Sequence, residues 1–246
     1  MNPPFLAVVI PAYNEEVRIV PTLTRINEYL SAQDYSWSVT VVSDGSTDQT
    51  VAVSQEFAAQ HEGFSVVDSQ PNQGKGAVVR QGILASECEL VLFSDADLAT
   101  PIEEVEKLLK ALDGSDIAIG SRPLKESDLE VRQPLYRELL GRMFNFFVQT
   151  LAIKGIKDTQ CGFKLFKSAV AQDVFSRCKV DGFGFDFEAL MVAIDLDYKI
   201  AEVPVRWRHQ EGSKVVLMRD GPRMLRDLVK LRMAGKTKRL QKREGA

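Results

Sequence analysis

The stretch ELVLFSDADLATPIEE, residues 89–104, is an apolar run that ends in two aspartates, Asp95 and Asp97, just before Pro101 opens a helix-length segment. Two carboxylates this close repel each other, so the arrangement costs stability unless a positive group lies between them. Side chains at i and i+2 of an extended backbone project to the same side, so both carboxylates can approach one cation. Carboxylate oxygens select Mg²⁺ or Mn²⁺, which also take substrate phosphates as ligands. The stretch therefore predicts a buried strand with a metal site at its end.

The alternative interpretation of this pair is an aspartate-rich N-cap of the following helix. A D-x-D pattern alone is weak evidence, and the chain carries a second one at Asp195 and Asp197, which we interpret as a solvated turn between a helix and a strand. Position distinguishes the first pair, because it follows an apolar run and precedes a proline-started helix. We therefore assign the metal to Asp95 and Asp97.

The first half of the chain alternates between short apolar runs and helix-length segments. Runs this rich in Val, Ile, Leu and Phe are typical of strands that are covered on both faces. Strand–helix alternation predicts a mainly parallel sheet flanked by helices, which is a Rossmann-like α/β fold. The expected strands are residues 5–12, 37–44, 64–69, 89–95 and 116–121, and the expected helices are residues 15–32, 48–60, 75–86 and 101–112.

The second half of the chain is less regular, and no internal repeat or low-complexity linker divides it from the first half. We expect one domain over residues 1–221, followed by a basic amphipathic extension over residues 222–246. The elements expected in this half are an apolar helix over 133–153, a helix over 168–177, a strand over 198–207 and a basic helix from about residue 218.

Ligands of open parallel sheets bind beyond the carboxyl ends of the strands. Polar loops follow all five expected strands, and their acidic, small and basic residues should therefore converge on one edge of the sheet. These loops are PAYNEE (11–16), SDGSTDQT (43–50), QPNQGKGA (70–77), SDADLATP (94–101) and GSRP (120–123).

Two of these loops suggest contacts with a nucleotide. Asp44 ends a strand in a position where an acid commonly accepts hydrogen bonds from a ribose or base, although a tight turn is the alternative. Gly74, Lys75 and Gly76 precede a helix and form a plausible phosphate cradle. The glycines match neither G-x-G-x-x-G, because Val79 takes the last glycine position, nor a Walker A loop. A dehydrogenase and a P-loop enzyme are therefore disfavoured.

Composition is that of a soluble globular protein, with 246 residues, 45% hydrophobic and 26% charged. The three cysteines show no C-x-x-C spacing, so we expect neither disulfides nor a zinc site, and a reducing cytosol fits. We expect no signal peptide and no transmembrane helix. The net charge of -3 hides an asymmetry, because residues 222–246 hold nine Lys and Arg against two acids. Such a basic tail suggests an anionic partner, although a frayed, solvated terminus is the alternative.

The apolar helix expected over 133–153 is the second feature that bears on a membrane. A core helix is the usual meaning of such a stripe. Its uncharged part, Met143 to Ile153, is about half of the roughly 20 residues that a membrane span needs. We therefore expect an interfacial helix, with Arg137 and Arg142 near headgroups. Together with the basic extension, this helix predicts a peripheral protein on the cytoplasmic face of a membrane.

The loop sequences resemble a known family. VVIPAYNEE (8–16), VVSDGSTDQT (41–50), NQGKGAVVRQG (72–82) and FSDADLATP (93–101), in that order, resemble the inverting family 2 glycosyltransferases of the GT-A fold. The resemblance extends over roughly residues 5–233 and narrows to the dolichyl-phosphate (polyprenyl-phosphate) β-glucosyltransferases, relatives of the dolichyl-phosphate mannose synthases. The segments that narrow it are DTQCGFKLF (158–166), GFGFDFEAL (182–190) and EVPVRWRHQEGSKV (202–215).

The resemblance implies a UDP-glucose donor, a polyprenyl or dolichyl phosphate acceptor, and Mg²⁺ or Mn²⁺. It implies that Asp95 and Asp97 hold the metal on the donor diphosphate. Two features depart from the family pattern: we expect no counterpart of the membrane anchor of the eukaryotic enzymes, and Ala99 stands where mannose synthases often have a Gln metal ligand. The implied nucleotide-sugar residues are Pro11, Tyr13, Glu15, Asp44, Gly45, Lys75 and Asp95, and the implied acceptor-phosphate residues are Arg122, Arg137, Ser213 and Lys214.

The acceptor decides whether the reaction needs a base. A divalent cation neutralises the charge that develops on the leaving diphosphate. A lipid phosphate, with a second pKa of about 6, is already an anionic nucleophile near neutral pH and needs cationic residues around it. A sugar hydroxyl must instead lose a proton, and Asp186 would be the candidate base. We expect Asp95, Asp97, Asp186 and Arg122 to be the catalytic residues.

Several alternatives stay open at this stage. The donor could be GDP-mannose with the same lipid, or the acceptor could be a polysaccharide or protein hydroxyl, which would require Asp186. A nucleotidyltransferase would want a Gly-rich loop with Arg where this chain has PAYNEE (11–16). A non-catalytic module would not need the aspartate pair. We expect no nucleic-acid partner, and we interpret His61 and His209 as structural, although His209 could touch substrate.

Overall fold

The computed structural model describes residues 3–131, 147–149, 153, 155–210 and 217–244. The strands are β1 (Leu6–Ala12), β2 (Trp37–Asp44), β3 (Phe64–Ser69), β4 (Leu90–Ser94), β5 (Ile117–Ser121), β6 (Asp128–Val131), β7 (Phe163–Lys167), β8 (Ile200–Pro204) and β9 (Arg206–Arg208). The helices are α1 (Ile19–Leu30), α2 (Thr50–Gln60), α3 (Lys75–Ala85), the 3₁₀ turn η1 (Ile102–Glu104), α4 (Val105–Ala111), α6 (Ser168–Phe175), α7 (Phe185–Asp195) and α8 (Leu217–Glu244).

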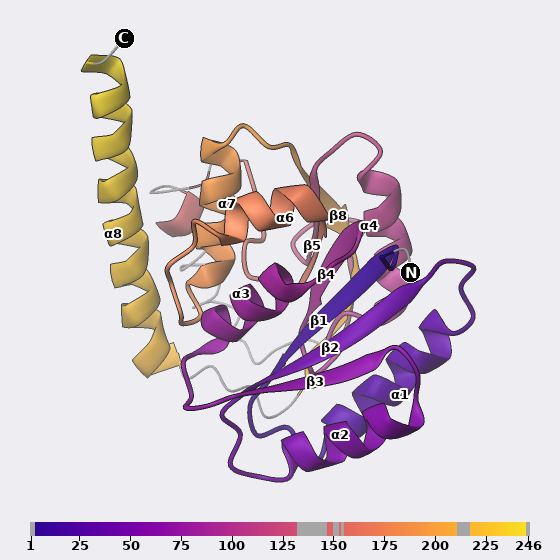
Figure 1. The fold of residues 1–246 in the computed structure, drawn as a ribbon. Helices are drawn as coiled ribbons and strands as arrows, with labels where there is room; N and C mark the ends of the chain where they lie inside the picture. The colour runs from indigo at the N-terminus through magenta and orange to yellow at the C-terminus, as the bar shows by residue number, and fades with distance from the viewer. Residues whose placement is uncertain (1–2, 132–146, 150–152, 154, 211–216, 245–246) are drawn as a thin grey trace.

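The main sheet has the strand order β3-β2-β1-β4-β7-β5-β8, and a separate two-stranded sheet pairs β6 with β9 (Figure 1). All pairs of the main sheet are parallel except those of β7, which runs antiparallel to both β4 and β5. The mainly parallel α/β fold predicted from the strand–helix alternation is confirmed. The sequence pattern did not assign β7, whose insertion between two parallel strands shapes the site described below.

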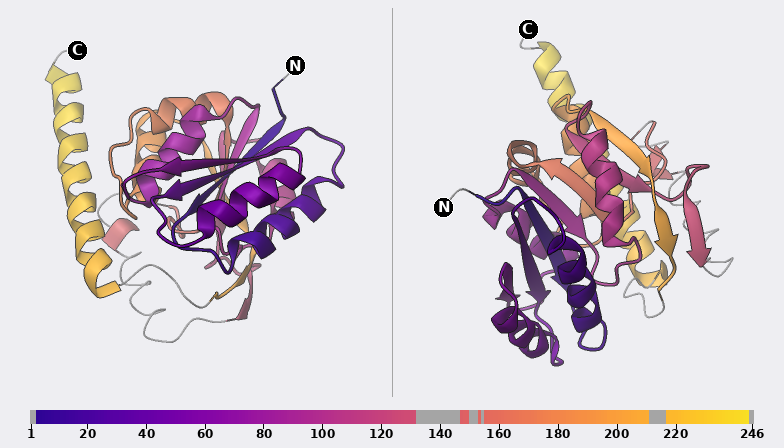
Figure 2. Two further views of the ribbon diagram at one scale, coloured as in Figure 1. Left: turned by 60° about the horizontal axis from the view of Figure 1, so that its bottom comes forward. Right: turned by 90° about the vertical axis from the view of Figure 1, so that its right-hand side faces the viewer.

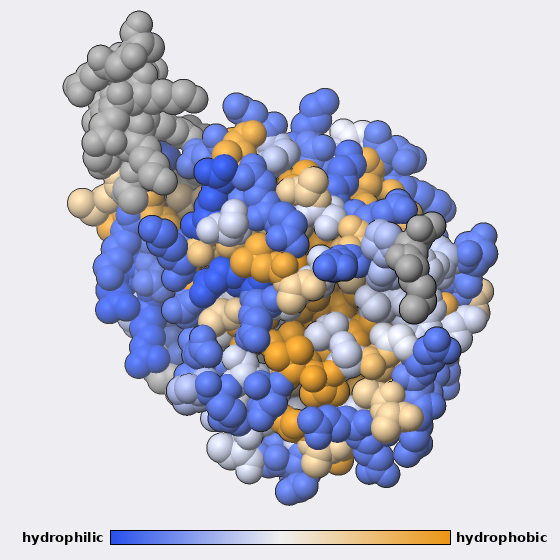
Figure 3. All heavy atoms as spheres, viewed as in Figure 1, coloured by the Kyte–Doolittle hydropathy of each residue, from blue (hydrophilic) through white to orange (hydrophobic). Residues whose placement is uncertain are grey.

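Helices cover both faces of this sheet (Figure 2). Residues of β1 alternate between the two sides: Val9 packs in one core cluster with α3, α6 and α7, whereas Val8 packs in the other with α1, α2 and α4. This two-sided burial is the reason that the strands read as continuous apolar runs. The face viewed in Figure 1 is polar around its rim and shows hydrophobic residues toward its centre (Figure 3).

Helix α8 stands beside α7 and extends past the body of the molecule toward the C-terminus (Figure 1). Met224 and Leu228 are buried in the core cluster of α3, α6 and α7, and Asp220 is also buried. The predicted boundary at residue 222 therefore falls inside one continuous helix, Leu217–Glu244, whose first half packs on the rest of the molecule. Among the described residues, no helix is both long and apolar enough to cross a membrane.

Most of the predicted interfacial helix 133–153 lies outside the described residues, as do Arg137, Ser213 and Lys214. Of its described part, Val148 and Ile153 are fully buried in the same core cluster as Leu228, whereas Phe147 is 40% exposed. This end of the segment thus belongs to the core, as the alternative interpretation expected.

Candidate active site

The carboxyl ends of β1, β2, β4 and β5 meet at one edge of the sheet, because these strands are parallel. Strand β7 runs the opposite way, so the segment that leads into it reaches the same edge. Ser94, the last residue of β4, pairs with Phe163, the first residue of β7. The amide of Asp95 donates a 3.0 Å hydrogen bond to the carbonyl oxygen of Gly162. The DTQCG segment, residues 158–162, therefore lies beside the predicted metal ligands.

Gly162 lets the Asp95 carboxylate lie directly against the backbone. A Cβ atom at residue 162 would come within 2.0 Å of Asp95 Oδ2 and 2.2 Å of its Cγ. Real Cβ atoms do not approach other atoms this closely, so any other residue would displace the carboxylate. The conformation of Asp95 thus depends on a glycine that is distant in sequence.

The loop that carries the aspartate pair is fixed from two sides. Thr22 Oγ1 of α1 donates to the carbonyl oxygen of Ala96 at 2.6 Å. Asp97 Oδ1 accepts a 3.0 Å hydrogen bond from the Ala99 amide, around Leu98 with a φ of 43°. The following helix begins without a side-chain cap. Asp97 therefore closes a turn in its own loop, and the N-cap alternative is wrong. The second D-x-D pattern forms the turn between α7 and β8, where Asp197 has a φ of 64°.

The aspartate pair is suited to a divalent cation. Burial, and after it the charge of the neighbouring Asp95 carboxylate, raises the pKa of Asp97. No group of three or more His, Cys, Asp and Glu able to hold a metal occurs among the described residues. Mg²⁺ is usually bound by one or two carboxylates, and phosphate oxygens and water complete its coordination shell. The residues present therefore fit Mg²⁺ or Mn²⁺ bound together with a diphosphate.

Lys75, at the first position of α3, supplies the positive group nearest to the pair. Its Nζ lies 2.6 Å from Asp95 Oδ1 and 5.3 Å from the centroid of the Phe93 ring. Burial lowers the pKa of Lys75, but the charges of Asp95, Asp186 and Asp97 outweigh that effect and raise it. The Lys75 side chain therefore stays protonated and forms an ion pair with Asp95, a predicted metal ligand.

A second buried pair lies behind the first. Lys164 of β7 is 1% exposed, and its ammonium donates to Asp186 of α7 and, at 2.6 Å, to the carbonyl oxygen of Cys161. Burial raises the pKa of Asp186, and the charges of Lys164 and Lys75 oppose that effect. Asp186, the candidate base for a hydroxyl acceptor, is 4% exposed and engaged in this ion pair.

Asp44 holds the loop from which Lys75 projects. Its carboxylate accepts hydrogen bonds from the backbone amides of Gln73 at 2.7 Å and Gly74 at 3.0 Å, and from Asn72 Nδ2 at 3.0 Å. The adjacent Gly45 has a φ of +66°, and a Cβ there would lie 2.6 Å from the Asn72 amide nitrogen. In this structure the Asp44–Gly45 turn therefore organises the loop of Gly74, Lys75 and Gly76. The binding of a phosphate by this loop and the contact of Asp44 with a ribose or base stay predictions.

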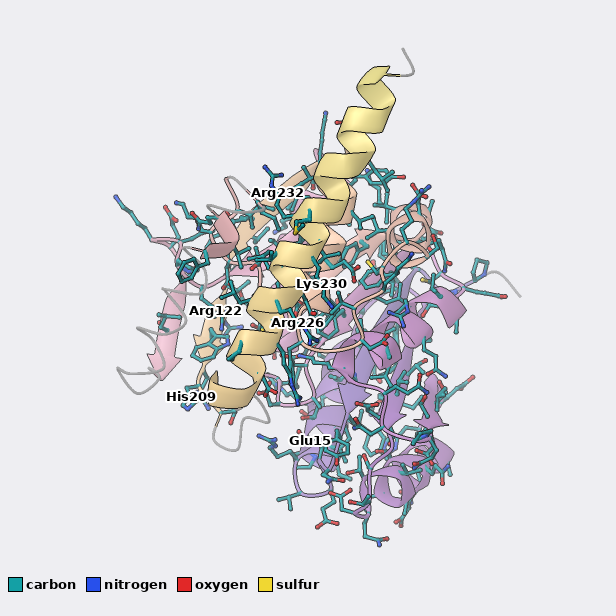
Figure 4. The ribbon with its side chains drawn as sticks, turned by 90° about the vertical axis from the view of Figure 1, so that its left-hand side faces the viewer. Glu15, Arg122, His209, Arg226, Lys230 and Arg232 are labelled. Carbon is teal, nitrogen blue, oxygen red and sulfur yellow. The ribbon has the colours of Figure 1, made fainter. Side chains whose placement is uncertain are left out.

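The remaining predicted nucleotide residues follow β1. Pro11 is buried within the strand, Tyr13 is 38% exposed, and Glu15 is mostly buried and pairs with Arg18 at 2.6 Å. The amide of Glu15 also donates to Thr50 Oγ1 at 2.7 Å, which ties this loop to the start of α2. Glu15 projects at the lower part of the molecule in Figure 4, while Arg122 lies nearer its centre.

Arg122, predicted to face the acceptor phosphate, is held by a bidentate ion pair. Its Nε and one terminal nitrogen donate to the two oxygens of Asp158 at 2.6 and 2.8 Å, and its guanidinium carbon lies 5.5 Å from the Trp207 ring centroid. The Arg122 guanidinium holds the pKa of Asp158 below its usual range despite burial. The backbone amide of Asp158 donates a 2.9 Å hydrogen bond to Glu202 Oε1, so Asp158 is itself held in place. Asp158 and Glu202 therefore hold the Arg122 guanidinium in a fixed position.

Strand β9 is hydrogen-bonded to the loop that carries Asp95 and Asp97. The amide of Arg208 donates to the carbonyl oxygen of Ala99 at 2.8 Å, and the buried Glu104 accepts Arg206 Nε at 2.6 Å. His209 follows directly, with its ring centroid 6.0 Å from that of Trp207. The EVPVRWRHQ segment is thus placed at the same edge as the aspartate pair. His61, by contrast, stacks on Phe57 with centroids 3.9 Å apart, as expected for a structural residue.

The structure brings together Asp95, Asp97, Lys75 and Asp186, and it attaches Arg122 to Asp158, the first residue of the DTQCG segment. Sequence reasoning missed the roles of Asp158, Gly162 and Lys164, which it quoted only as part of a resemblance. The available signal was the lysine of GFKLF (162–166), because a single charge within an apolar run indicates a buried partner. The approach of Gly162 to Asp95 had no signal in the sequence.

We expect Gly162→Ala to weaken binding of Mn²⁺ by at least about tenfold, which is about 1.4 kcal/mol. The added methyl group would overlap the Asp95 carboxylate and push it away from Asp97. Isothermal titration calorimetry with Mn²⁺ and UDP measures the effect. Gly114→Ala is the matched control, since a Cβ at residue 114 meets nothing within 4 Å. Equal affinities for the two variants would show that Asp95 does not hold the metal.

Comparisons with known proteins show the family of this chain. A family model described as glycosyl transferase family 2 matches residues 7–175. The chain is 37% identical over 249 residues to the dolichyl-phosphate beta-glucosyltransferase of Saccharomyces cerevisiae, covering 94% of this chain and 75% of that protein. It is 38% identical over 242 residues to the Homo sapiens dolichyl-phosphate beta-glucosyltransferase, covering 93% of this chain and 75% of that protein.

Among solved structures, the chain is similar to glucosyl-3-phosphoglycerate synthase from Mycobacterium tuberculosis in complex with UDP. The TM-score is 0.66 at 22% identity, covering 94% of this chain and 79% of that chain. The same synthase in complex with Mn²⁺, UDP-glucose and phosphoglyceric acid gives a TM-score of 0.67 at 21% identity, with the same coverage. At this identity the likeness shows the fold, and the sequence matches show the family. The chain belongs to glycosyltransferase family 2.

Proposed function

We propose that this glycosyltransferase moves glucose from UDP-glucose to a dolichyl or polyprenyl phosphate, with inversion, to give a β-linked lipid-phosphate sugar. The observation that carries the proposal is the arrangement around residues 158–162. Gly162, at one end, contacts the loop of Asp95 and Asp97, which fit a metal-bound diphosphate, and Asp158, at the other end, holds the guanidinium of Arg122. A donor diphosphate and an anionic acceptor are the two substrates that such a pair of sites would take.

The donor proposal rests on residues of the aspartate edge. A divalent cation held by Asp95 and Asp97 would neutralise charge on the diphosphate as it leaves. Lys75 would add a positive charge on the same group. The exposed ring of Tyr13 and the loop organised by Asp44 line the neighbouring part of the edge, where we place uracil and ribose. The names of the curated relatives support glucose as the sugar.

The acceptor proposal rests on cations and on the state of Asp186. A lipid phosphate is already ionised and requires positive groups that reduce its repulsion from the donor, which the rigid Arg122 would provide. A hydroxyl acceptor would instead require an accessible base. Asp186 is nearly fully buried and ion-paired with Lys164, so it is poorly placed to reach such a hydroxyl. The geometry therefore favours the phosphate acceptor over the hydroxyl alternative.

We further propose that α8 helps the enzyme reach the lipid at the cytoplasmic face of a membrane. Its buried side is formed by Met224 and Leu228. Arg223, Arg226 and Lys230 lie on the opposite side and are exposed, as the view in Figure 4 shows for Arg226 and Lys230. Basic residues near an anionic leaflet contribute on the order of 1 kcal/mol each. Several of them suffice for reversible docking without a membrane span.

The transfer reaction tests the central proposal. With C55 or dolichyl phosphate as acceptor, UDP-glucose should be used in preference to GDP-mannose, and labelled sugar should enter the lipid fraction. Asp95→Asn and Asp97→Asn should each lower the rate by at least about 10²-fold, because an unneutralised diphosphate is a poor leaving group. EDTA should do the same to the wild type.

Asp195→Asn is the matched control for that experiment, because it alters the second D-x-D pattern, which lies in the turn after α7. It should retain the wild-type rate. Full activity in EDTA would contradict the metal proposal, and a preference for GDP-mannose would replace the proposed donor.

Flotation with anionic vesicles tests the membrane proposal. The wild type should float at low salt and less at high salt, because screening weakens the attraction of Lys and Arg. Arg226→Glu combined with Lys230→Glu should reduce flotation, as should truncation after Met233. Lys110→Glu combined with Lys199→Glu makes the same charge change on exposed residues at the other edge of the sheet and should float like the wild type. Wild-type protein that stays soluble with these vesicles would rule the docking surface out.

A further inference from the structure

Lys75 and a divalent cation would compete for the same carboxylate. The ammonium of Lys75 lies 2.6 Å from Asp95 Oδ1, in direct contact with one of the two carboxylates that fit the metal. Two cations on one carboxylate repel each other strongly at this distance. A metal that binds Asp95 would therefore weaken or displace the contact with Lys75.

The support of Lys75 is rigid, while its tip has room to move. The residue begins α3 directly after Gly74, whose φ is +108° and whose amide is held by Asp44. The side chain of Lys75 is 23% exposed, whereas that of Lys164 is 2% exposed and its ammonium is fixed by Asp186 and the Cys161 carbonyl. Of these two lysines, Lys75 is therefore the one able to change partner.

Charge balance explains why the protein would keep a cation in this place. The charge of Lys164 balances that of Asp186. Lys75 is then the lysine that contacts the aspartate pair, and its ammonium also lies near the aromatic rings of Phe93 and Phe185. Without Lys75 the metal-free pair, in its half-buried loop, would keep the charges of Arg18 and Arg122 but would lose the cation in direct contact with it. With both Lys75 and a metal, the same pair would be in excess of positive charge, which a donor diphosphate would offset.

We propose that Lys75 is an internal counter-cation that occupies Asp95 in the metal-free enzyme, cedes it to the divalent cation, and then binds the diphosphate of the donor. This inference rests on the metal site of the proposed function. Its consequence is a coupling between two ligands: the metal alone binds weakly because it must displace Lys75, and a nucleoside diphosphate strengthens metal binding because it receives the displaced ammonium. Metal and donor then arrive together.

Titration of Mn²⁺ followed by electron paramagnetic resonance, with and without UDP, tests the coupling without any transfer reaction. Lys75→Met should bind Mn²⁺ alone more tightly than the wild type, by a factor in the range of roughly 5–150 that is usual for coupled sites. The same variant should lose most of the gain in Mn²⁺ affinity that UDP gives the wild type. Lys75→Gln is the second variant in case Lys75→Met does not fold, and Lys75→Arg, which keeps the charge, should resemble the wild type.

Lys167→Met is the matched control, because Lys167 Nζ pairs with Asp116 at 3.3 Å near the other end of β7. It removes the same charge and should titrate like the wild type. If the neutral variants at residue 75 bind Mn²⁺ no more tightly than the wild type, Lys75 only orients Asp95 and the inference is wrong. If no protein binds Mn²⁺ even with UDP, the metal site itself is wrong, and the inference is overturned with it.

Discussion

The hydrogen bond from the Asp95 amide to the Gly162 carbonyl marks the constraint on which the rest of the site depends. It exists because β7 runs antiparallel between β4 and β5, so that one segment reaches the ends of two parallel strands at once. That segment presents Asp158 to Arg122 on one side, and Gly162 to Asp95 on the other. The proposed donor and acceptor positions therefore share one support, and a shift of the segment would disturb both.

Ion pairs stabilise the many charged side chains at this edge of the sheet. Buried ions are stable only when each is paired and hydrogen-bonded. Asp158 pairs with Arg122, Asp186 with Lys164, and Asp95 with Lys75, while burial and the neighbouring Asp95 raise the pKa of Asp97. The two carboxylates that lie together are the ones at which the proposed metal would bind.

The sequence predicted the parallel part of the fold well because strands covered on both faces are apolar throughout. Five expected strands agree with the observed ones to within one residue at each end. Strand β7 was not predicted because Lys164 interrupts its apolar run. A buried lysine in a strand makes sense only with its ion-pair partner, Asp186, which is distant in sequence. The D-x-D pair was found through its place at a strand end. The roles of Gly162 and Asp158 could not be predicted, because they arise from contacts between separate strands.

Anomalous diffraction at the manganese edge, from crystals grown with Mn²⁺ and UDP, tests the central claim that this sheet edge is a metal–diphosphate site. The account predicts one strong peak within coordination distance of both Asp95 and Asp97, with diphosphate oxygens completing its shell. A peak at the turn that carries Asp195 and Asp197, or UDP bound with no peak between Asp95 and Asp97, would contradict it.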